Sequence, residues 1–203
     1  MTVSRDAVME SALGDGEQRI RAAVVELLET EDYDAIQVRE VARRARVSLS
    51  KIYKLYGTRD ELILAAINWW MAENAYASLP EHAAQPGESL HVALMRVLRP
   101  IFEPLERHPR LLAAYFRVRA STRGEMLVSH GLEAVFPAAM AALVDVDIEF
   151  VQDIDAILQS LVYGLMGRFT AGEIEVTDIV PAIDRTVFWL TSGYEATRTH
   201  QEM

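Results

Sequence analysis

The stretch that decides the fold is VREVARRARVSLSKIYKLYGTRDEL, residues 38–62. Its first part, VREVARRA, places small apolar residues on one stripe at the spacing of an amphipathic helix. A short break follows, in which Ser48 can cap the next helix by accepting a backbone N–H. The second part, LSKIYKLY, leaves Ser50, Lys51 and Lys54 on its free face. The stretch therefore predicts a helix-turn-helix whose short second helix fits the major groove of DNA.

Charge is distributed unevenly along the chain. Between Ile36 and Arg59 there are seven basic residues and one acid, Glu40, which gives this segment a charge of +6. The whole chain carries −10, so the other segments together carry −16. The only two lysines, Lys51 and Lys54, both lie in the second helix of the motif. Such a basic island on an acidic protein is typical of phosphate binding. The alternative is a solvated basic face on an ordinary helical hairpin.

The order of these residues resembles the DNA-binding domain of TetR-type one-component repressors over residues 17–64, most specifically in the run IYKLYGTRDEL. Arg46 stands where that family usually has glycine, which costs about 1 kcal/mol if the residue adopts a positive φ. Leu55 stands where the family usually has a second Tyr or His, so the resemblance implies that one phosphate-contacting group is missing. Tyr53 is retained, and Arg59 occupies the position of a basic residue that meets the DNA backbone in the family.

The motif and the resemblance together predict DNA contacts on the first three helices and at the start of the fourth. Gln37 stands where the family favours Thr, so the cap of its helix is expected to be weak. The operator is expected to be an inverted repeat in double-stranded DNA, because the family is dimeric. The predicted contacts are Arg19, Gln37, Arg39, Ser48, Ser50, Lys51, Tyr53, Lys54, Tyr56 and Arg59.

The composition excludes several classes of protein. The 203 residues are 51% hydrophobic, enough for a sizeable core, and include no cysteine, so disulfide frameworks and thiolate metal sites are excluded. The longest apolar runs are interrupted well short of 18 residues, and the N-terminus lacks the apolar core of a signal peptide. We therefore expect a cytoplasmic protein without a membrane partner. The acidic balance confines DNA binding to the basic island.

Apolar periodicity predicts an all-α protein of about nine helices, because no segment alternates as a strand does. We expect a flexible N-terminal arm over residues 1–15, a helix-turn-helix domain over 16–62, and a ligand-binding and dimerisation domain over 63–203. A long helix from about Arg59 to Ser78 is expected to connect the two domains, and residues 80–87 read as a linker.

Proline and glycine give the boundaries of several other helices. The first helix is predicted from about Glu17 to Glu31, after the glycines that end the arm. Pro100 and Pro104 predict a kinked or split helix, and Pro137 predicts a second kink. Pro109 is expected to open a helix.

Two late helices, predicted at 149–169 and 176–194, are apolar on more than one side. A surface helix of a monomer can bury only one side, so pairing of both helices across a two-fold axis is predicted, and the family dimerises in this way. The alternative is that the first of them is wholly interior. The predicted interface residues are Ile154, Leu158, Leu161, Leu165, Ile183, Val187, Phe188 and Tyr194.

Bulky apolar residues gather on the middle helices, where proline kinks can hold helices apart around a pocket. Taken one by one, they could equally be plain core. A narrower similarity of residues 107–121 and 161–193 to the family's repressors of steroid and cholesterol breakdown implies a sterol-derived acyl-CoA or another large flat lipid. Arg117, Arg119 and Arg123 would then meet a phosphate or carboxylate, or else form a solvated helix face. The predicted pocket residues are Trp69, Trp70, Leu98, Phe102, Tyr115, Phe116, Arg119, Met126, Tyr163 and Met166.

The sequence contains no nucleophile elbow, no HExxH and no phosphate-cradling glycine loop. His130 and Glu133, three residues apart, could supply half of a metal site or form a surface pair. We therefore expect no enzymatic activity, no cofactor and no metal. The prediction is a homodimeric transcriptional repressor that responds to a hydrophobic small-molecule effector. That it represses rather than activates transcription is implied by the resemblance alone. The competing class is a helical-bundle lipid carrier or enzyme with an incidental helix-turn-helix.

Overall fold

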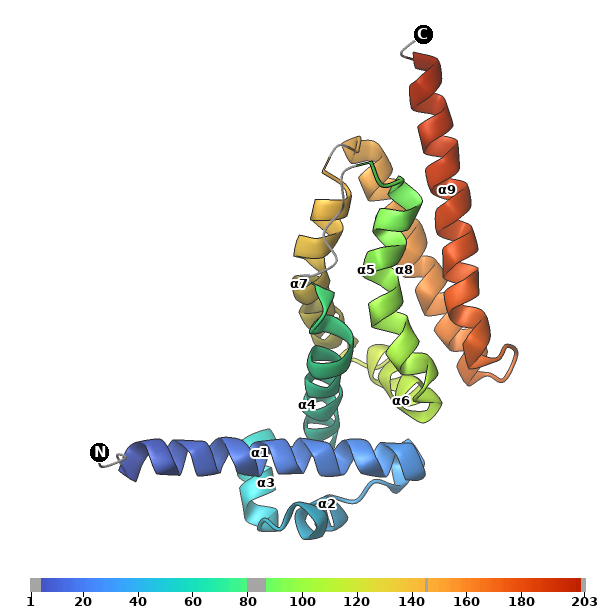
Figure 1. The fold of residues 1–203 in the computed structure, drawn as a ribbon. Coiled ribbons are helices and arrows are strands. Elements are labelled where there is room, and N and C mark those ends of the chain that lie inside the picture. The colour runs from blue at the N-terminus through green and yellow to red at the C-terminus, as the bar shows by residue number, and fades with distance from the viewer. Residues whose placement is uncertain (1–4, 80–86, 145, 202–203) are drawn as a thin grey trace. The chain divides into compact units, whose positions relative to one another are not determined.

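The computed structural model describes the backbone of residues 5–79, 87–144 and 146–201, and the side chains from residue 14 to residue 198 within those ranges. The described residues form helices joined by short turns and contain no strand, which confirms the all-α prediction (Figure 1). The chain divides into two compact units, residues 1–70 and 71–203, and the division falls inside the helix that begins at Arg59. Most of the predicted linker, residues 80–86, lies outside the described residues.

The first unit holds the basic island. Its elements are α1 (Arg5–Thr30), the 3-10 turn η1 (Tyr33–Ala35), α2 (Val38–Ala45), α3 (Leu49–Tyr56) and α4 (Arg59–Met71). The bounds of α2 and α3 confirm the predicted helix-turn-helix.

Helix α1 starts much earlier than predicted. It begins at Arg5 rather than near Glu17, so residues 5–15 of the predicted arm continue the helix. Gly14 and Gly16 each cost about 1 kcal/mol relative to alanine inside a helix, but glycine does not forbid helical geometry, and alanine, leucine and methionine around them favour it. Residues 1–4 lie outside the described part of the chain.

The core of the first unit follows the predicted apolar stripes. Helix α1 packs along α2, and α2 packs against α3. The buried side chains of these three helices include Ile20, Val24, Leu27, Leu28, Val41, Ala45 and Ile52. Burial of each large aliphatic side chain contributes about 1.5–3 kcal/mol, so this small interface holds the two helices of the motif in place.

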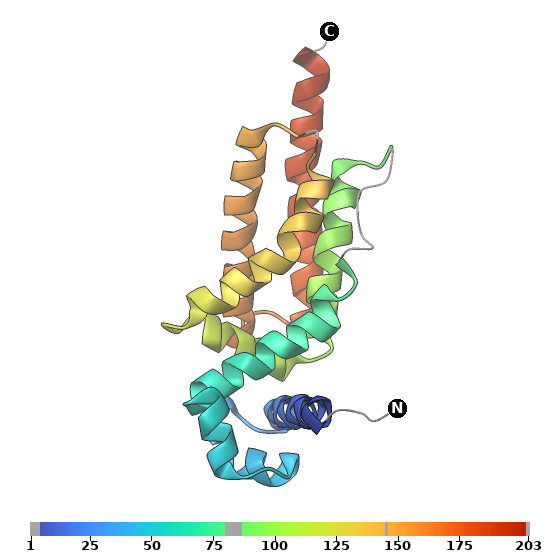
Figure 2. The same ribbon diagram turned by 90° about the vertical axis from the view of Figure 1, so that its left-hand side faces the viewer.

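The second unit is a bundle around α5. Helix α5 contacts η2, α6, α7 and α9, while α8 packs against α6 and α9. Figure 2 shows α8 (orange) and α9 (red) running side by side near α5 (green). The elements are the π-helical turn η2 (Ala72–Tyr76), α5 (Leu90–Glu106), α6 (Pro109–Arg119), α7 (Gly124–Ala142), α8 (Ile148–Thr170), the 3-10 turn η4 (Val176–Asp178) and α9 (Ile179–Gln201).

The prolines of the second unit sit at two kinds of position. Pro109 is the first residue of α6, as predicted, where its missing N–H has no partner to lose. Pro100 and Pro104 lie inside α5, and Pro137 lies inside α7. Of the two forms predicted for the first pair, a kinked helix or a split one, the structure excludes the split form, because α5 is a single uninterrupted helix.

None of the described helices has the length and apolarity needed to cross a membrane.

Candidate nucleic-acid interface

The turn between α2 and α3 is closed by a left-handed residue. Arg46 has φ 55° and ψ 46°, and it follows the last residue of α2. The N–H of Val47 donates to the carbonyl of Ala42 at 3.0 Å, and the N–H of Arg46 donates to that of Arg43 at 3.3 Å. This pair of bonds is the Schellman motif. The condition stated for Arg46 is therefore met: it adopts the positive φ that glycine usually takes, at a cost of about 1 kcal/mol or more.

Both ends of the second helix of the motif, α3, are fixed locally. The Oγ of Ser48 accepts the N–H of Lys51 at 3.1 Å, which confirms the predicted cap. At the other end, Gly57 adopts φ 70°, and its N–H donates to the carbonyl of Tyr53 at 2.9 Å. Ile52 is buried between these ends. The rotation of α3 about its axis is therefore set, and with it the face that remains free.

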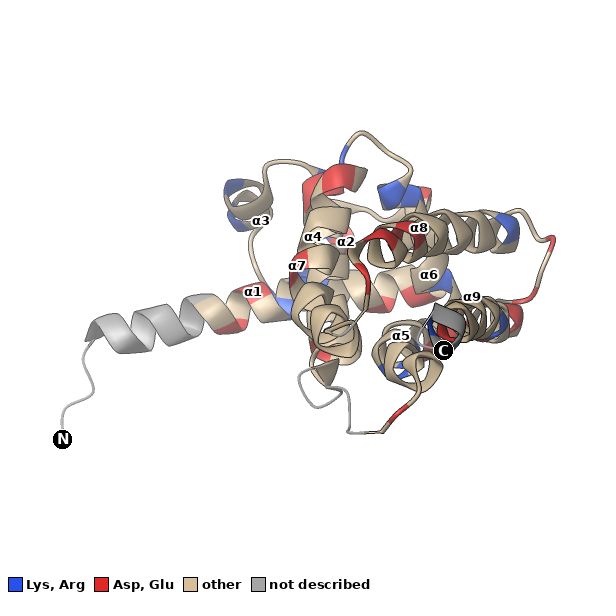
Figure 3. Cartoon of the chain, turned by 90° about the horizontal axis from the view of Figure 1, so that it is seen from above, with Lys and Arg blue, Asp and Glu red and all other residues tan. Residues whose placement is uncertain are grey.

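The free face of α3 carries polar and basic groups. Ser50 and Lys54 are exposed, and Tyr53 exposes 48% of its surface. Lys51 is only half exposed, because its ammonium group lies against α1, 2.6 Å from where a Cβ on Gly16 would be. In Figure 3, α3 carries blue and no red. The face thus offers a cation, a phenol and a hydroxyl, which are groups that contact phosphates and base edges.

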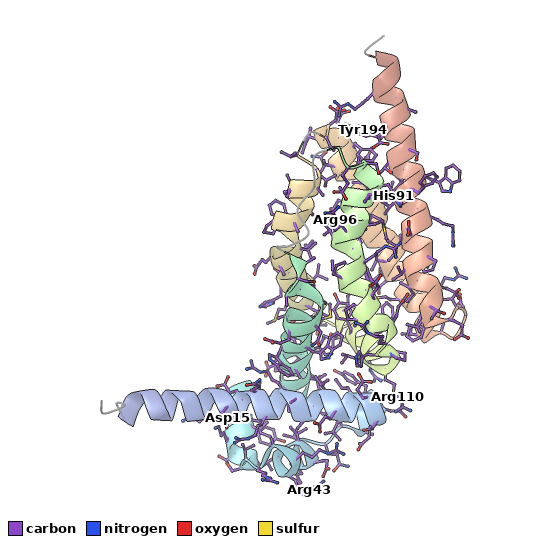
Figure 4. All side chains as sticks on the ribbon, in the orientation of Figure 1. Asp15, Arg43, His91, Arg96, Arg110 and Tyr194 are labelled. Carbon is purple, nitrogen blue, oxygen red and sulfur yellow. The ribbon has the colours of Figure 1, made fainter. Side chains whose placement is uncertain are left out.

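The single acid of the basic island is enclosed by arginines. Glu40 accepts from Arg43 at 2.8 and 2.6 Å and from Arg44 at 2.9 Å. These hydrogen bonds from Arg43 and Arg44 lower the pKa of Glu40 to about 2. Arg39 and Arg46 are exposed and form no ion pair with any carboxylate in the described part of the chain. Figure 4 shows Arg43 on the side of α2 away from α1. The island therefore keeps free cations on its surface.

Arg59 differs from its predicted role as a DNA contact. Its Nε donates to the carbonyl of Ile36 at 2.8 Å, a second nitrogen donates to the carbonyl of Tyr33, and a third meets Asp60 at 3.1 Å. Its guanidinium also lies 4.9 Å from the centre of the Tyr33 ring. These partners commit Arg59 to joining the η1 loop to the start of α4, so it does not reach outward.

Arg19 is also committed within the unit. Its Nε donates to the carbonyl of Ala45 at 3.2 Å, and its guanidinium pairs with Asp15. The last carbonyls of a helix lack partners inside the helix, and Arg19 satisfies one of those of α2. Arg19 thus fixes α1 to α2 while its side chain stays 48% exposed.

Tyr56 is the third predicted contact that turns inward. Its hydroxyl is buried without a hydrogen-bond partner, as is the Nε of Arg21. Burial raises the pKa of the Tyr56 phenol, although the charge of Arg21 opposes the shift. Arg21 also lies 5.9 Å from the centre of the Trp69 ring. Tyr56 therefore contributes to the interior of the unit.

Gln37 is exposed and makes no capping bond, in line with the weak cap predicted, and remains available to DNA.

Helix α4 begins with a reciprocal cap. The N–H of Glu61 donates to the Oγ1 of Thr58 at 3.2 Å, and the N–H of Thr58 donates to the carboxylate of Glu61 at 3.0 Å. This capping box confirms the predicted cap and satisfies two backbone donors at once.

The predicted pocket residues fall in both units. Trp69 and Trp70 belong to the first unit, and the others to the second. Tyr115 and Met166 are buried, whereas Met126 is 54% exposed on α7 and so departs from the prediction of a pocket residue. The rings of Phe116 and Tyr163 lie 5.2 Å apart. The structure thus brings α6 and α8 side chains together and leaves Met126 outside that group. Leu98, Phe102, Phe116 and Arg119 are half-buried.

The predicted dimer residues lie on two sides of α8 and α9. Four of them are buried inside the second unit and are corrected from interface to core: Ile154, Leu165, Ile183 and Val187. Leu158, Leu161 and Tyr194 are half-buried, and Phe188 is exposed. Ile157 and Trp189, which the predicted set does not contain, are exposed on the same helices. Their apolar character was visible in the sequence, but the rotation of each helix was not.

A surface groove of about 390 Å³ lies between the start of α8 and the later part of α9. Phe150 and Tyr194 stack at 4.1 Å in its wall, and the Tyr194 hydroxyl donates to Asp147 at 2.9 Å. Trp189 and Gly193 complete one side of the groove.

Among the described residues, no three His, Cys, Asp or Glu side chains lie close enough together to bind a metal. His130 instead contacts the carbonyl of Met126 at 2.7 Å.

Comparison with known proteins gives two family matches and several similar structures. Residues 20–66 match the bacterial regulatory proteins of the tetR family, and residues 87–190 match the tetracyclin repressor-like C-terminal domain. No curated protein matches the chain.

The fold resembles solved structures of transcriptional regulators. A TetR transcriptional regulator from Rhodococcus sp. RHA1 has a TM-score of 0.69 and 21% identity, over 87% of this chain and 95% of its own. A tetR-family transcriptional regulator from Streptomyces coelicolor has a TM-score of 0.61 and 17% identity, over 91% of this chain and 83% of its own. These relatives are regulators rather than enzymes. Because the C-terminal family model alone spans more than half of the sequence, and the N-terminal model covers the helix-turn-helix, the chain belongs to the TetR family of bacterial transcriptional regulators.

Proposed function

We propose that the protein is a homodimeric repressor that binds an inverted-repeat operator through α3 and releases it when a hydrophobic small molecule binds the second unit. The observation that carries the proposal is the free face of α3, where Ser50, Tyr53 and Lys54 are exposed on an otherwise acidic chain. The Ser48 cap and the Arg46 turn hold this face in one orientation. A rigid helix with exposed cations and hydroxyls suits the major groove.

The structure refines the proposed set of DNA contacts. Arg19, Tyr56 and Arg59 are committed inside the first unit and leave the set. Lys51 can join it only by leaving Gly16, which a flexible side chain does at small cost. The remaining proposed contacts are Gln37, Arg39, Ser48, Ser50, Tyr53 and Lys54, with Arg46 added because it is exposed.

The test is selection of DNA from a random pool, followed by anisotropy titration of the selected duplex. We expect an inverted repeat whose half-site centres lie about 34–36 Å apart, or a multiple of that spacing. The double variant Lys51→Ala/Lys54→Ala should bind more weakly without loss of helicity. Arg110→Gln is the matched control, because it removes an exposed charge from α6, in the second unit. An asymmetric single site, or full affinity in the double variant, would contradict the proposal.

The proposed dimer uses the outer face of α8 and α9. Ile157 and Phe188 are exposed, and Trp189 exposes 71% of its surface. Exposed aromatic side chains beside an open groove are costly in water. A second copy of the chain in a two-fold arrangement would cover these side chains and the groove.

Trp189→Asp should shift the protein from dimer to monomer in sedimentation velocity, because the dimer would bury an unpaired charge. Val144→Asp is the matched control: Val144 is also an exposed apolar residue, but it lies beyond the end of α7. Wild-type protein that is monomeric at micromolar concentration would contradict the dimer.

The proposed effector site lies among α5, α6, α7 and α8. Support comes from the half-buried aromatic side chains Phe102 and Phe116, which leave apolar surface that a guest molecule can cover. Sterol-derived acyl-CoA thioesters are among the candidates. Linkage requires that effector and operator weaken each other by the same factor, about 5–150-fold. Equal effector affinities for free and operator-bound protein would leave a binder without a switch.

A further inference from the structure

We propose that Arg119, Tyr76 and Tyr115 form an anchor for the carboxylate of an apolar acid in the second unit. This inference rests on the proposed function, because it names the chemical class of the effector. Arg119 is the last residue of α6, Tyr115 lies one turn before it, and Tyr76 lies in the π-helical turn η2. The anchor would therefore join two elements that are distant in sequence.

Arg119 is a half-buried cation without an anion. None of the carboxylates in the described ranges forms an ion pair with it, and its guanidinium instead lies 5.3 Å from the centre of the Tyr163 ring. Other arginines of the same unit are paired: Arg96 with Glu88, and Arg168 with Glu173 at 3.1 Å. Partial removal of a charge from water is unfavourable without an opposite charge. A ligand carboxylate would supply the missing partner.

The two tyrosines supply neutral hydrogen-bond donors, and Tyr115 lies on the same face of α6 as Arg119, one turn before it. Tyr115 is 9% exposed, and Tyr76 is half-buried. Burial raises the pKa of both phenols, and the charge of Arg119 opposes the shift without cancelling it. Both hydroxyls therefore stay protonated at physiological pH. A protonated phenol can donate a hydrogen bond to a carboxylate, as a guanidinium does.

Glycines make the close approaches around these groups possible. A Cβ on Gly131 of α7 would lie 3.0 Å from the hydroxyl oxygen of Tyr76. A Cβ on Gly124 would lie 1.9 Å from the carbonyl oxygen of Arg119, so the turn between α6 and α7 admits no side chain there. The backbone carbonyl of Arg119 and the hydroxyl of Tyr76 thus each lie against a glycine.

The surroundings of the anchor determine the rest of the ligand. The rings of Phe116 on α6 and Tyr163 on α8 contact each other, with Tyr163 44% exposed, and a Cβ on Gly167 of α8 would lie 3.3 Å from the Phe116 ring. Met166 is fully buried on the same helix. Such side chains favour an apolar body, while Arg119 and the phenols favour an acidic end. The structure therefore assigns an apolar carboxylic acid as the class of effector.

The experiment compares dodecanoate with dodecanol, which share a chain and differ at the end group. Each displaces the neutral dye N-phenyl-1-naphthylamine from the full-length protein. The wild type should bind the acid at least about tenfold more tightly, as expected for charge-assisted hydrogen bonds. Arg119→Gln should abolish the preference, whereas Arg119→Lys should keep part of it and Tyr115→Phe should reduce it.

Arg117→Gln is the matched control. It removes the same charge from an exposed position of the same helix, about 200° around the axis from Arg119. It should leave the preference unchanged. Equal affinities for acid and alcohol in the wild type would overturn the proposal, as would a preference that survives Arg119→Gln. Dodecyl phosphate binding as tightly as the acid, with the same dependence on Arg119, would overturn the assignment to a carboxylate.

Operator binding separates this inference from the proposed function. Arg119→Gln should bind the selected duplex with wild-type affinity, because Arg119 lies outside the DNA-binding unit. If operator binding is intact and the acid preference is absent, the anchor is wrong and the regulator stands. If the acid preference is present and no duplex is bound, the proposed function is wrong.

Discussion

Replacing Arg46 with glycine should stabilise the protein, although the arginine belongs to the basic island. Arg46 has φ 55° and ψ 46°, where a residue with a Cβ is disfavoured by about 1–2 kcal/mol. Glycine adopts this conformation without that cost but loses about 0.5–1 kcal/mol more backbone entropy on folding. The difference leaves a net stabilisation of about 0.5–1 kcal/mol.

Arg46→Ala isolates the backbone contribution. Alanine removes the same charge and the same long side chain, but it keeps the Cβ. Both variants retain the backbone hydrogen bonds of the turn, Val47 to Ala42 at 3.0 Å and residue 46 to Arg43 at 3.3 Å. The difference in stability between the glycine and alanine variants therefore reports the backbone contribution, which is the relief of the left-handed conformation less the extra entropy that glycine loses on folding.

The assay is urea denaturation without DNA, in which a shift of midpoint at constant slope measures the change in stability. Thermal melting measures the same change independently: for a chain of this size, 1 kcal/mol of stability corresponds to a change of about 2–4 °C in Tm. Arg46→Gly should therefore melt about 1–4 °C above Arg46→Ala. If the glycine variant is no more stable than the alanine variant, the turn does not strain Arg46 and the reasoning fails.

Three further predictions concern the first unit. Glu40→Gln should lower stability at neutral pH. Because the pKa of Glu40 is depressed from 4.5 to about 2, the contribution of its carboxylate is present above pH 4.5 and lost as pH falls towards 2, so melting curves of the two proteins should converge over that range. Tyr56→Phe should raise stability by about 1 kcal/mol in urea denaturation, because it removes a buried hydroxyl without a partner, and should leave operator affinity unchanged. Arg59→Lys should cost about 1–3 kcal/mol, because one ammonium group cannot replace the bonds to the carbonyls of Tyr33 and Ile36, and an unchanged melting curve would contradict that role.

The parts of the fold that were predictable from the sequence are those determined locally. Ser48 and Thr58 accept N–H groups three residues ahead, and Pro109 opens a helix, so each start can be recognised from a few adjacent residues. For the turn at Arg46 the resemblance marked the position where a glycine is usual, but it left the sign of φ open. The early start of α1 was not predictable, because the glycines near residue 15 weaken a helix without ending it.

The partners of long cationic side chains could not be predicted. The sequence shows that Arg19 and Arg59 lie near the motif, but their acceptors are backbone carbonyls 26 and 23 residues away in the chain. Only the folded chain brings these atoms together. The same holds for Lys51, whose ammonium lies on a glycine of α1. Charge patterning therefore overestimated the number of free cations on the basic island.

The rotation of α8 and α9 about their own axes also could not be predicted from the sequence. A helix that is apolar on several sides gives no periodicity from which the covered side can be read. Ile154 and Ile157 are both apolar and three residues apart, yet the first is 2% exposed and the second 40%. Which of them faces outward depends on where α6 and α9 pack against α8. Several of the residues predicted for the dimer therefore lie on the buried side of α8 and α9.

The salt dependence of operator binding should reflect only the cations that remain free. Of the seven basic residues in the island, Arg59 is bound to carbonyls, and Arg43 and Arg44 share the carboxylate of Glu40. Each phosphate contact contributes about −0.9 to the slope of log K against log salt concentration. Four free cations predict a slope of about −3.6 per protomer, whereas seven would give about −6.3. The acidic remainder of the chain adds little, because charges beyond about 8–10 Å are screened at physiological salt.

Anisotropy titrations over a series of salt concentrations measure the slope. Arg46→Ala should reduce its magnitude by about 0.9, and Arg59→Gln, which removes the charge of a side chain bound to carbonyls, should leave it unchanged. A slope that falls in both variants would mean that Arg59 leaves its carbonyl partners when DNA binds.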